Sequence, residues 1–165
     1  MDMKSFKESL KESKVLWGIK KYASEDAHSK GETFEETEFE GNVMVNEGIN
    51  ELWTLVCSAT GTEYDNSNAY LGVGTGTTAA EAADTGLEAN GVFVGMDLTY
   101  PTYGTSQKAT WKATFGAAVA NQAWAEFCVA NGDSNGTTLL NHKISAQGTK
   151  VVDQVWELTL EITLS

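Results

Sequence analysis

The segment KATWKATFGAAVANQAWAEFCVANG, residues 108–132, contains two apolar runs separated by small residues. In the first run, residues 109–115, apolar residues alternate with threonine and lysine, and this period of two predicts a half-buried β-strand. The second run, residues 123–130, places large apolar groups on both faces, which is typical of a strand covered on both sides. Glu126 lies inside this second run. We therefore expect its carboxylate either to meet a hydrogen-bonding partner or to be an interface carboxylate at a subunit boundary.

Alternating apolar and polar residues predict several further strands. They lie at about 14–22, 33–40, 69–73, 91–96, 138–144 and 155–164. The last of them carries the strongest signal, because large apolar residues occupy every second position from Trp156 to Leu164. Clusters of glycine, asparagine and serine between the runs are typical of turns. Short strands joined by such turns predict a mainly β fold, a β-sandwich or jelly roll.

One segment, at about 46–58, has helical periodicity. Asn46 is a favourable N-cap residue. The apolar residues of the segment fall on one stripe: Ile49, Leu52, Trp53 and Val56. We expect this one α-helix to pack that stripe on the sheet. Residues 25–31 are predicted to form a turn or loop, and residues 79–83 a single helical turn within a long connection.

Length and charge limit the classes of function. With 165 residues, the chain suits one domain with a substantial core, and we divide it into an N-terminal arm, 1–13, and a β-rich domain, 14–165. The formal net charge of −12 argues against a nucleic-acid partner, which needs basic density. The chain also has no arginine, the residue that suits phosphate contacts best, which argues against nucleotide enzymes.

Targeting signals and cysteines add two expectations. No apolar run approaches the roughly 20 residues of a membrane span, and the charged N-terminus lacks the apolar segment of a signal peptide. We therefore expect synthesis in the cytoplasm and no membrane partner. Cys57 and Cys128 both lie in apolar runs and are predicted to be buried free thiols.

Lysine is concentrated near the N-terminus. Seven of the 11 lysines lie within residues 1–30, and none lies between Lys30 and Lys108, where the chain is strongly acidic. Two apolar arm residues are four positions apart, which is helical spacing, but one such pair does not hold a helix in water. We expect either an arm that orders on a partner or a solvated tail. The residues predicted to contact the partner are Lys4, Phe6, Lys7, Leu10, Lys11 and Trp17.

Candidate chemistry is sparse. The glycine-rich segment GVGTGTT, residues 72–78, follows a predicted strand but lacks the ending of a phosphate loop, so a flexible turn is the preferred interpretation. Cys128 and His142 could meet on neighbouring strands, but no third group orients them for nucleophilic catalysis. The acidic and amide residues at 63–68 and 133–135 match turns better than a calcium loop. We predict no catalytic residues, no cofactor and no metal.

The aromatic residues divide into core and surface candidates. Four of the tryptophans are predicted to fill the core rather than to stack on carbohydrate: Trp17, Trp111 and Trp156 on strands, and Trp53 on the helix stripe. Tyrosine supplies contact area with a polar tip, so tyrosines in predicted loops are better candidates for a contact surface. These are Tyr64, Tyr70 and, in an exposed contact loop, Tyr100 and Tyr103.

Several blocks of the sequence resemble a widespread family of tailed-bacteriophage virion proteins. The blocks are NEGINEL (46–52), NAYLGVGTGTTAA (68–80), ATFGAAVANQAWA (113–125), LNHK (140–143) and GTK (148–150), followed by the closing strand. They span most of residues 42–165, and their motifs are structural rather than catalytic. His142 stands where the family pattern has arginine, and Cys128 stands where glycine is common.

The resemblance implies a capsid decoration (cement) protein. Such proteins are β-rich and often trimeric, and they sit on the outer capsid surface of the virion across capsomer junctions. It therefore implies the major capsid protein as partner, self-association as a homotrimer, and contact of residues 1–22 with the shell or a neighbouring subunit. One alternative is a tail-tip, collar or fibre-base protein that uses the loop with Tyr100 and Tyr103. Another is a small hydrolase that uses Cys128 or Glu126.

Overall fold

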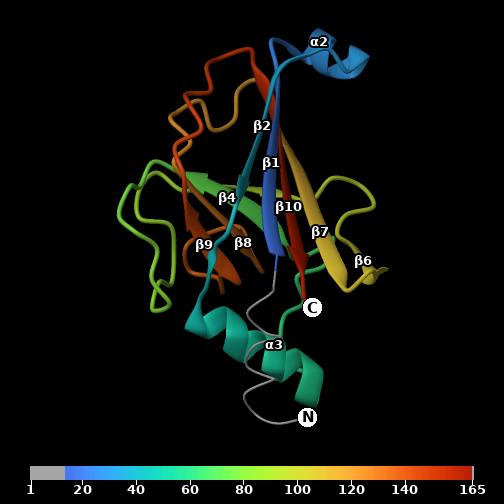
Figure 1. Ribbon diagram of the computed structural model, residues 1–165, viewed down its shortest axis with the longest axis vertical. Coiled ribbons are helices and arrows are strands. Elements are labelled where there is room, and N and C mark those ends of the chain that lie inside the picture. The colour runs from blue at the N-terminus through green and yellow to red at the C-terminus, as the bar shows by residue number, and fades with distance from the viewer. Residues whose placement is uncertain (1–13, 165) are drawn as a thin grey trace.

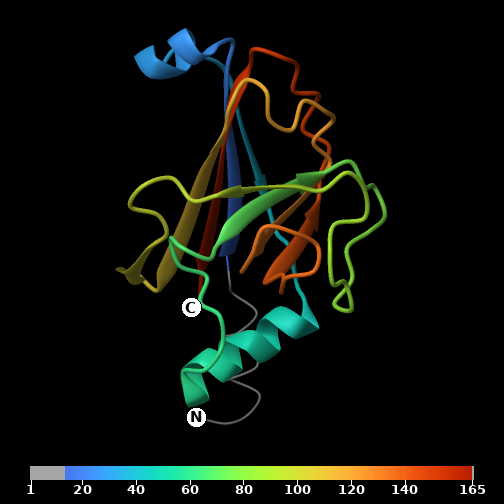
Figure 2. The ribbon, with the colours of Figure 1, turned by 180° about the vertical axis from the view of Figure 1, so that it is seen from behind.

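The structure is a computed structural model that describes residues 14–164. Two five-stranded antiparallel sheets pack face to face, with a helix near each end of the sandwich (Figures 1 and 2). The strands are β1 (Lys14–Tyr22), β2 (Thr33–Glu40), β3 (Val43–Met44), β4 (Tyr70–Gly74), β5 (Val92–Gly95), β6 (Thr102–Thr105), β7 (Lys108–Phe115), β8 (Glu126–Ala130), β9 (Asn141–Ile144) and β10 (Val155–Thr163). The helices are α2 (Glu25–Lys30) and α3 (Asn46–Ser58). The predicted β-sandwich is confirmed.

The first sheet has the strand order β2-β1-β10-β7-β6. The C-terminal strand β10 lies at its centre and pairs along its length with β1 on one side and β7 on the other. Its register places Leu160 opposite both Trp17 and Trp111, and all three side chains are buried. The alternation seen in the sequence is therefore the core face of this sheet.

The second sheet has the order β3-β9-β8-β4-β5. Every residue of β8 is buried, because the strand is covered on both faces, as the sequence predicts. One face meets the first sheet, where the rings of Trp17 and Phe127 lie 5.7 Å apart. The other face carries a smaller apolar cluster formed by Val45, Leu87, Cys128, Ala130 and Leu139.

The main core lies between the sheets. Three of the four tryptophans assigned to the core are buried: Trp17, Trp111 and Trp156. Trp17 has no exposed surface, so the prediction that it contacts a partner is wrong. It donates from Nε1 to the carbonyl of Gly41 at 3.2 Å, which satisfies its one polar group inside the fold.

Residues 25–31 form the helix α2 and its C-cap instead of the predicted loop. The hydroxyl of Ser24 accepts a hydrogen bond from the N–H of Ala27 at 3.1 Å, and Gly31 closes the helix with a left-handed backbone at φ 71°. Acidic residues in the first turn also favour this helix. No residue of α2 is buried, so the sequence has no apolar stripe that would predict this helix. Its sequence signal is the pair of capping residues, Ser24 and Gly31.

The helix α3 has the predicted bounds but a different start. Val45 is its N-cap residue and forms no side-chain cap, and the N–H of Asn46 donates to the carbonyl of Ala82 at 2.7 Å. The prediction that Asn46 caps the helix is therefore wrong. Ala82 belongs to the long connection between β4 and β5, residues 75–91, so this connection contacts the first turn of α3. Residues 79–83, predicted to form a single helical turn, end in a turn that is not helical.

The inward face of α3 also differs from the prediction. Gly48 lies against Leu139 and Leu140, which directly precede β9, and a Cβ at this position would lie 2.5 Å from Cα of Leu140. This close approach turns Leu52 and Leu55 toward the core, where both are partly buried. Trp53 is 63% exposed, so its assignment to the core is wrong.

The two cysteines have opposite environments. Cys128 is a buried free thiol, as predicted, whereas Cys57 on α3 is exposed. The prediction for Cys57 is wrong because the helix face that carries it points away from the sheet. Neither helix in residues 14–164 is long and apolar enough to cross a membrane.

Candidate functional site around Glu126 and His142

Glu126 begins β8 and has no exposed surface. The strand pairing puts Gly74 of β4 directly opposite it, and His142 lies on the other neighbouring strand, β9. Residues 75–91, which we call the cradle loop, run alongside these strands (Figures 1 and 2). A charged group is costly to bury unless hydrogen bonds compensate it, so the partners of this carboxylate define the site.

The backbone of the cradle loop surrounds the Glu126 carboxylate. Oε1 accepts from the N–H of Gly76 at 2.8 Å and of Ala89 at 2.9 Å, and Oε2 accepts from the N–H of Glu88 at 2.8 Å. A Cβ at Gly76 would lie only 2.7 Å from Oε1, so glycine lets the backbone approach this closely. The glycine-rich segment therefore binds an anion, and that anion is the protein's own carboxylate. The hydrogen-bonding alternative predicted for Glu126 is the one that the structure adopts, and burial in the chain leaves no surface for an interface carboxylate.

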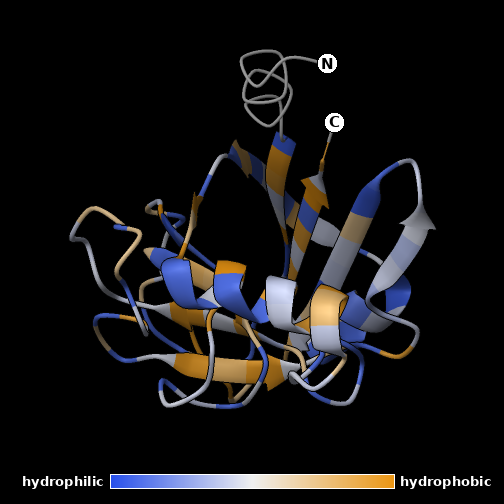
Figure 3. Ribbon diagram, turned by 90° about the horizontal axis from the view of Figure 1, so that it is seen from below, coloured by the Kyte–Doolittle hydropathy of each residue, from blue (hydrophilic) through white to orange (hydrophobic). Residues whose placement is uncertain are grey.

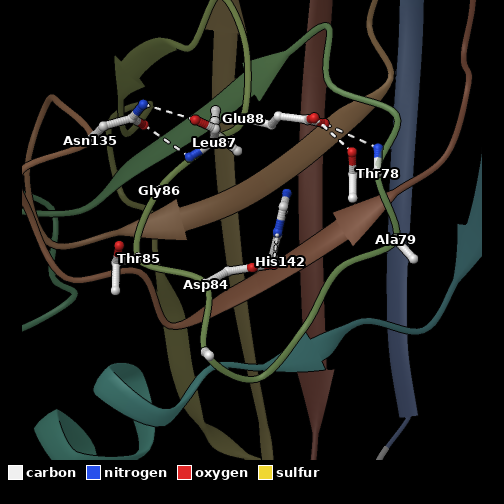
Figure 4. Close-up of a pocket in the computed structure, with 10 residues that line it drawn as sticks. Thr78, Ala79, Asp84, Thr85, Gly86, Leu87, Glu88, Asn135 and His142 are labelled. Carbon is white, nitrogen blue, oxygen red and sulfur yellow. Dashed lines mark hydrogen bonds and ion pairs between the residues drawn. The ribbon is translucent and has the colours of Figure 1, made fainter.

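His142 links this carboxylate to a second one. Its Nε2 lies 3.2 Å from Oε2 of Glu126, and its Nδ1 lies 2.6 Å from Oδ2 of Asp84. Asp84 belongs to the cradle loop, and Figure 4 shows its side chain directed at the imidazole. The imidazole thus connects β8, β9 and the loop.

The electrostatics favour the charged form of all three groups. Burial alone would raise the pKa of the Glu126 carboxyl, but hydrogen bonds from His142 and from the loop amides lower it below its ordinary value. Burial alone would lower the pKa of His142, but its bonds to Glu126 and Asp84 raise it. For Asp84, burial is likewise outweighed by bonds from the Glu81 amide and from His142, which lower its pKa. Both ring nitrogens of His142 face carboxylate oxygens, and both donate only in the imidazolium, so the geometry and the direction of the pKa shift favour this charged form.

A second carboxylate of the cradle loop closes the loop on itself. The hydroxyl of Thr78 donates to Oε1 of Glu88 at 2.6 Å, and the N–H of Thr78 donates to Oε2 at 3.0 Å (Figure 4). The N–H of Thr77 also donates to Oε2, at 3.0 Å. These hydrogen bonds, the hydroxyl of Thr78 first, lower the pKa of Glu88. Asn135 holds the neighbouring turn by bonding both the N–H and the carbonyl of Leu87.

An open cavity of about 500 Å³ lies beside this network (Figure 4). It is lined by Thr78, Ala79, Ala83, Asp84, Thr85, Gly86, Leu87, Glu88, Asn135 and His142. The ionisable side chains of this lining are Asp84, Glu88 and His142, and all three already bond within the chain. Within residues 14–164, no group of three or more His, Cys, Asp and Glu side chains is arranged to hold a metal ion.

The geometry suits fastening better than catalysis. A histidine acts as a general base through a ring nitrogen with a free lone pair, and His142 directs both ring nitrogens at carboxylates rather than at Cys128. Burial raises the pKa of the Cys128 thiol, which disfavours the reactive thiolate. Glu126, His142 and Asp84 therefore hold the cradle loop on the second sheet.

The other predicted contact residues fall in different places. Lys4, Phe6, Lys7, Leu10 and Lys11 lie outside the described residues. Tyr103 on β6 is 75% exposed, whereas Tyr100 is half-buried and its carbonyl accepts from Asn66 at 2.6 Å. Tyr64, a loop candidate for a contact surface, is buried and donates to the carbonyl of Thr138 at 3.3 Å, so that expectation is wrong.

Sequence reasoning missed Asp84 and Glu88 as members of the site. Both lie in a segment whose composition indicates only a polar connection. The signal that could have found them is the pairing of two anomalies, a glycine-rich loop without a phosphate motif and a carboxylate inside an apolar strand. Comparisons of the chain with protein-family models, curated proteins and solved structures found no match.

Proposed function

We propose that this protein is a non-enzymatic structural component of a tailed-bacteriophage virion, and specifically a decoration (cement) protein that binds the outer capsid surface and stabilises the shell. The observation that carries the proposal is the closed network around Glu126, which uses Glu126, His142 and Asp84 to fasten a loop. The blocks that resemble phage virion proteins fall on this framework. Residues 68–80 build β4 and part of the cradle loop, and residues 140–143 include His142.

The exposed edge of the first sheet supports a role at a solvated surface. The edge strand β2 carries four exposed glutamates: Glu35, Glu36, Glu38 and Glu40. Charged edge strands resist pairing with strands of other molecules. A protein that is crowded on a shell benefits from such an edge, because neighbouring copies then do not aggregate through their sheets.

The arm is the proposed attachment segment, and it is shorter than the segment 1–22 that the resemblance implies. Residues 14–22 form β1, which pairs with β2 on one side and β10 on the other. Because neither edge of this strand is free, we assign the shell contact to residues 1–13. Lys14 pairs with Thr163, and β1 therefore starts at the end of the sandwich where α3 lies (Figure 1). The partners in this proposal are the major capsid protein and further copies of the chain, as a homotrimer.

A tail-tip, collar or fibre-base protein remains the second candidate, and one observation favours it. Leu98 is 87% exposed and Tyr103 is 75% exposed, and both belong to the segment that leads into and forms β6. Exposed aliphatic and aromatic residues of this kind are common at contact surfaces. In that role the protein would bind a receptor or an adaptor protein through this segment.

The two candidates predict different effects of substitution on shell binding. Purified full-length protein is mixed with shells assembled from the major capsid protein alone, and binding is measured by co-sedimentation. The decoration proposal predicts saturable binding that is lost in a Lys4→Glu, Lys7→Glu, Lys11→Glu variant and kept in a Tyr103→Ser variant. Failure of the unaltered protein to bind shells would contradict the decoration proposal and favour the alternative. Loss of binding in Tyr103→Ser alone would show that the segment with Tyr103, rather than the arm, contacts the shell.

A further inference from the structure

The helix α3 presents more apolar surface than the fold uses. Gly48 is its only buried residue, while Leu52 and Leu55 pack partly on the main core. A second row of apolar residues, which we call the lateral stripe, consists of Ile49, Trp53 and Val56, which are 37%, 63% and 75% exposed. Figure 3 views this end of the molecule and shows α3 lying across it. The spacing of the stripe, i, i+4 and i+7, places its members on one side of the helix.

Polar contacts, rather than extensive burial, attach α3 to the sandwich. The Glu47 carboxylate accepts from the N–H of Leu139 at 2.8 Å, and the Glu51 carboxylate accepts from the N–H of Thr62 at 2.6 Å. A contiguous exposed row that includes a tryptophan is a typical mark of a contact surface. The lateral stripe therefore lacks the cover that a helix of this composition normally finds.

We propose that residues 1–13 of the same chain pack on the lateral stripe. The place where the arm leaves the sandwich supports this occupant. The carbonyl of Val15, the second residue of β1, accepts from the N–H of Gly41 at 2.9 Å, and Gly41 precedes α3 by only a few residues. Thirteen residues span up to about 45 Å when extended, whereas α3 is about 20 Å long, so the arm reaches every part of the stripe.

The apolar pattern of the arm matches the lateral stripe. Met3, Phe6 and Leu10 follow one another at i, i+3 and i+7, the spacing of a helical stripe of the same length. An isolated helix of this size is marginal in water, and the stripe on α3 is uncovered. Each segment therefore supplies the apolar surface that the other lacks.

Charge does not oppose this packing. The charged residues of α3, Glu47 and Glu51, fall on the side of the helix away from the lateral stripe, given 3.6 residues per turn, and they accept from the N–H groups of Leu139 and Thr62. The arm carries three lysines and three acidic residues, which lie outside the row of Met3, Phe6 and Leu10. The proposal does not depend on the virion function.

The reactivity of Cys57 reports whether the arm covers the lateral stripe. It follows Val56 directly and is exposed, whereas Cys128 is buried and its thiol pKa is raised by that burial. N-ethylmaleimide, which is uncharged, is applied to the folded full-length protein, and the labelling rate of Cys57 is followed by mass spectrometry. We expect labelling to be at least about fivefold faster in a Phe6→Asp, Leu10→Asp variant than in the unaltered chain, because the arm no longer shields the thiol.

A Ser5→Asp, Ser9→Asp variant is the matched control, since it adds the same two charges outside the apolar row. Its labelling rate should equal that of the unaltered chain, and circular dichroism confirms that all three proteins are folded. Equal rates in the unaltered chain and the Phe6→Asp, Leu10→Asp variant would overturn the proposal. Protection of Cys57 that appears only as protein concentration rises would also overturn it, because a second copy would then be the occupant.

Discussion

Nε2 of His142 lies 3.2 Å from Oε2 of Glu126, and both side chains are almost completely excluded from solvent. This contact joins β9 to a carboxylate that also collects three backbone N–H groups of the cradle loop. Every partner of Glu126 in this network is a donor, so only an ionised carboxylate accepts from all of them. The attachment of the cradle loop to the second sheet therefore depends on the negative charge of Glu126.

Replacing Glu126 by Gln tests this dependence. The amide keeps the shape of the side chain but removes the charge, and its NH₂ group faces N–H donors and the imidazolium. We expect Glu126→Gln to lower the free energy of unfolding by about 3 kcal/mol, since His142 is left as a buried cation with one partner fewer. Chemical denaturation monitored by circular dichroism measures the change.

Glu161→Gln is the control for that substitution. Glu161 pairs with Lys108 at 2.8 Å, but both side chains are partly exposed, so we expect a loss of less than about 1 kcal/mol. Similar losses for the two variants would show that the Glu126 network is no stronger than a surface ion pair.

The glycines around the carboxylate should resist enlargement. A Cβ at Gly74 would lie 2.6 Å from the carbonyl oxygen of Ala89, a backbone atom that cannot move without displacing the cradle loop. Gly74→Ala is expected to cost about 2 kcal/mol of stability. Gly136→Ala, where the nearest atom is the hydroxyl oxygen of Ser134 at 3.8 Å, should change stability by less than about 0.5 kcal/mol. The thermal midpoints of the two variants give the comparison, and equal midpoints would contradict it.

The contribution of His142 to stability should fall at alkaline pH. Its pKa is raised above the ordinary 6.5, so the folded chain holds the proton more tightly than the unfolded chain does. The stabilisation is therefore complete below 6.5 and declines as the pH rises through the raised value. We expect the difference in unfolding free energy between the unaltered chain and His142→Gln to shrink across that range. A difference that stays constant with pH would contradict an imidazolium at this position.

The loss of stability at acidic pH should come from the carboxylates of the network rather than from His142. The pKa values of Asp84 and Glu126 are lowered from the ordinary 3.8 and 4.5. Their stabilisation is therefore present above those values and is lost as the pH falls through the lowered ones. We expect a steeper acid loss of stability in the unaltered chain than in Glu126→Gln. Parallel acid transitions in urea titrations of the two proteins would count against this.

The two thiols should differ in reactivity in the folded protein. Iodoacetamide is expected to modify Cys57 without denaturant and Cys128 only after unfolding, because Cys128 is buried and its thiol pKa is raised. Peptide mapping assigns the modified residue. Rapid modification of Cys128 in the native state would reopen the hydrolase hypothesis.

Much of the fold could be predicted because strand periodicity is a local property. The strands β1 and β2 have the predicted bounds, and β7 begins one residue before its predicted run, since residues two apart on a half-buried strand share a face whatever their partners are. The inward face of α3 was not predictable in this way. Its sequence offers two apolar stripes, and the choice depends on the approach of Gly48 to Leu140, a residue distant in the chain.

The site was predictable only in part. A carboxylate in an apolar run must find donors, which identified Glu126. The segment 72–78 was interpreted as a flexible turn, and the hydrogen bond from its backbone to that carboxylate was not predicted. Their meeting depends on the register of β4 with β8, which puts Gly74 opposite Glu126, and no local pattern encodes a register between strands so far apart in sequence. Asp84 joins through the same long-range geometry.

The copy number of this protein in purified virions, relative to the major capsid protein, tests the proposed function most directly. Under the proposed function, a phage encodes the chain, and quantitative mass spectrometry of its virions provides the ratio. Decoration of the shell predicts copies close to the number of major capsid subunits, and a handful per particle would place the protein in the tail or collar. Complete absence from virions would contradict a structural role.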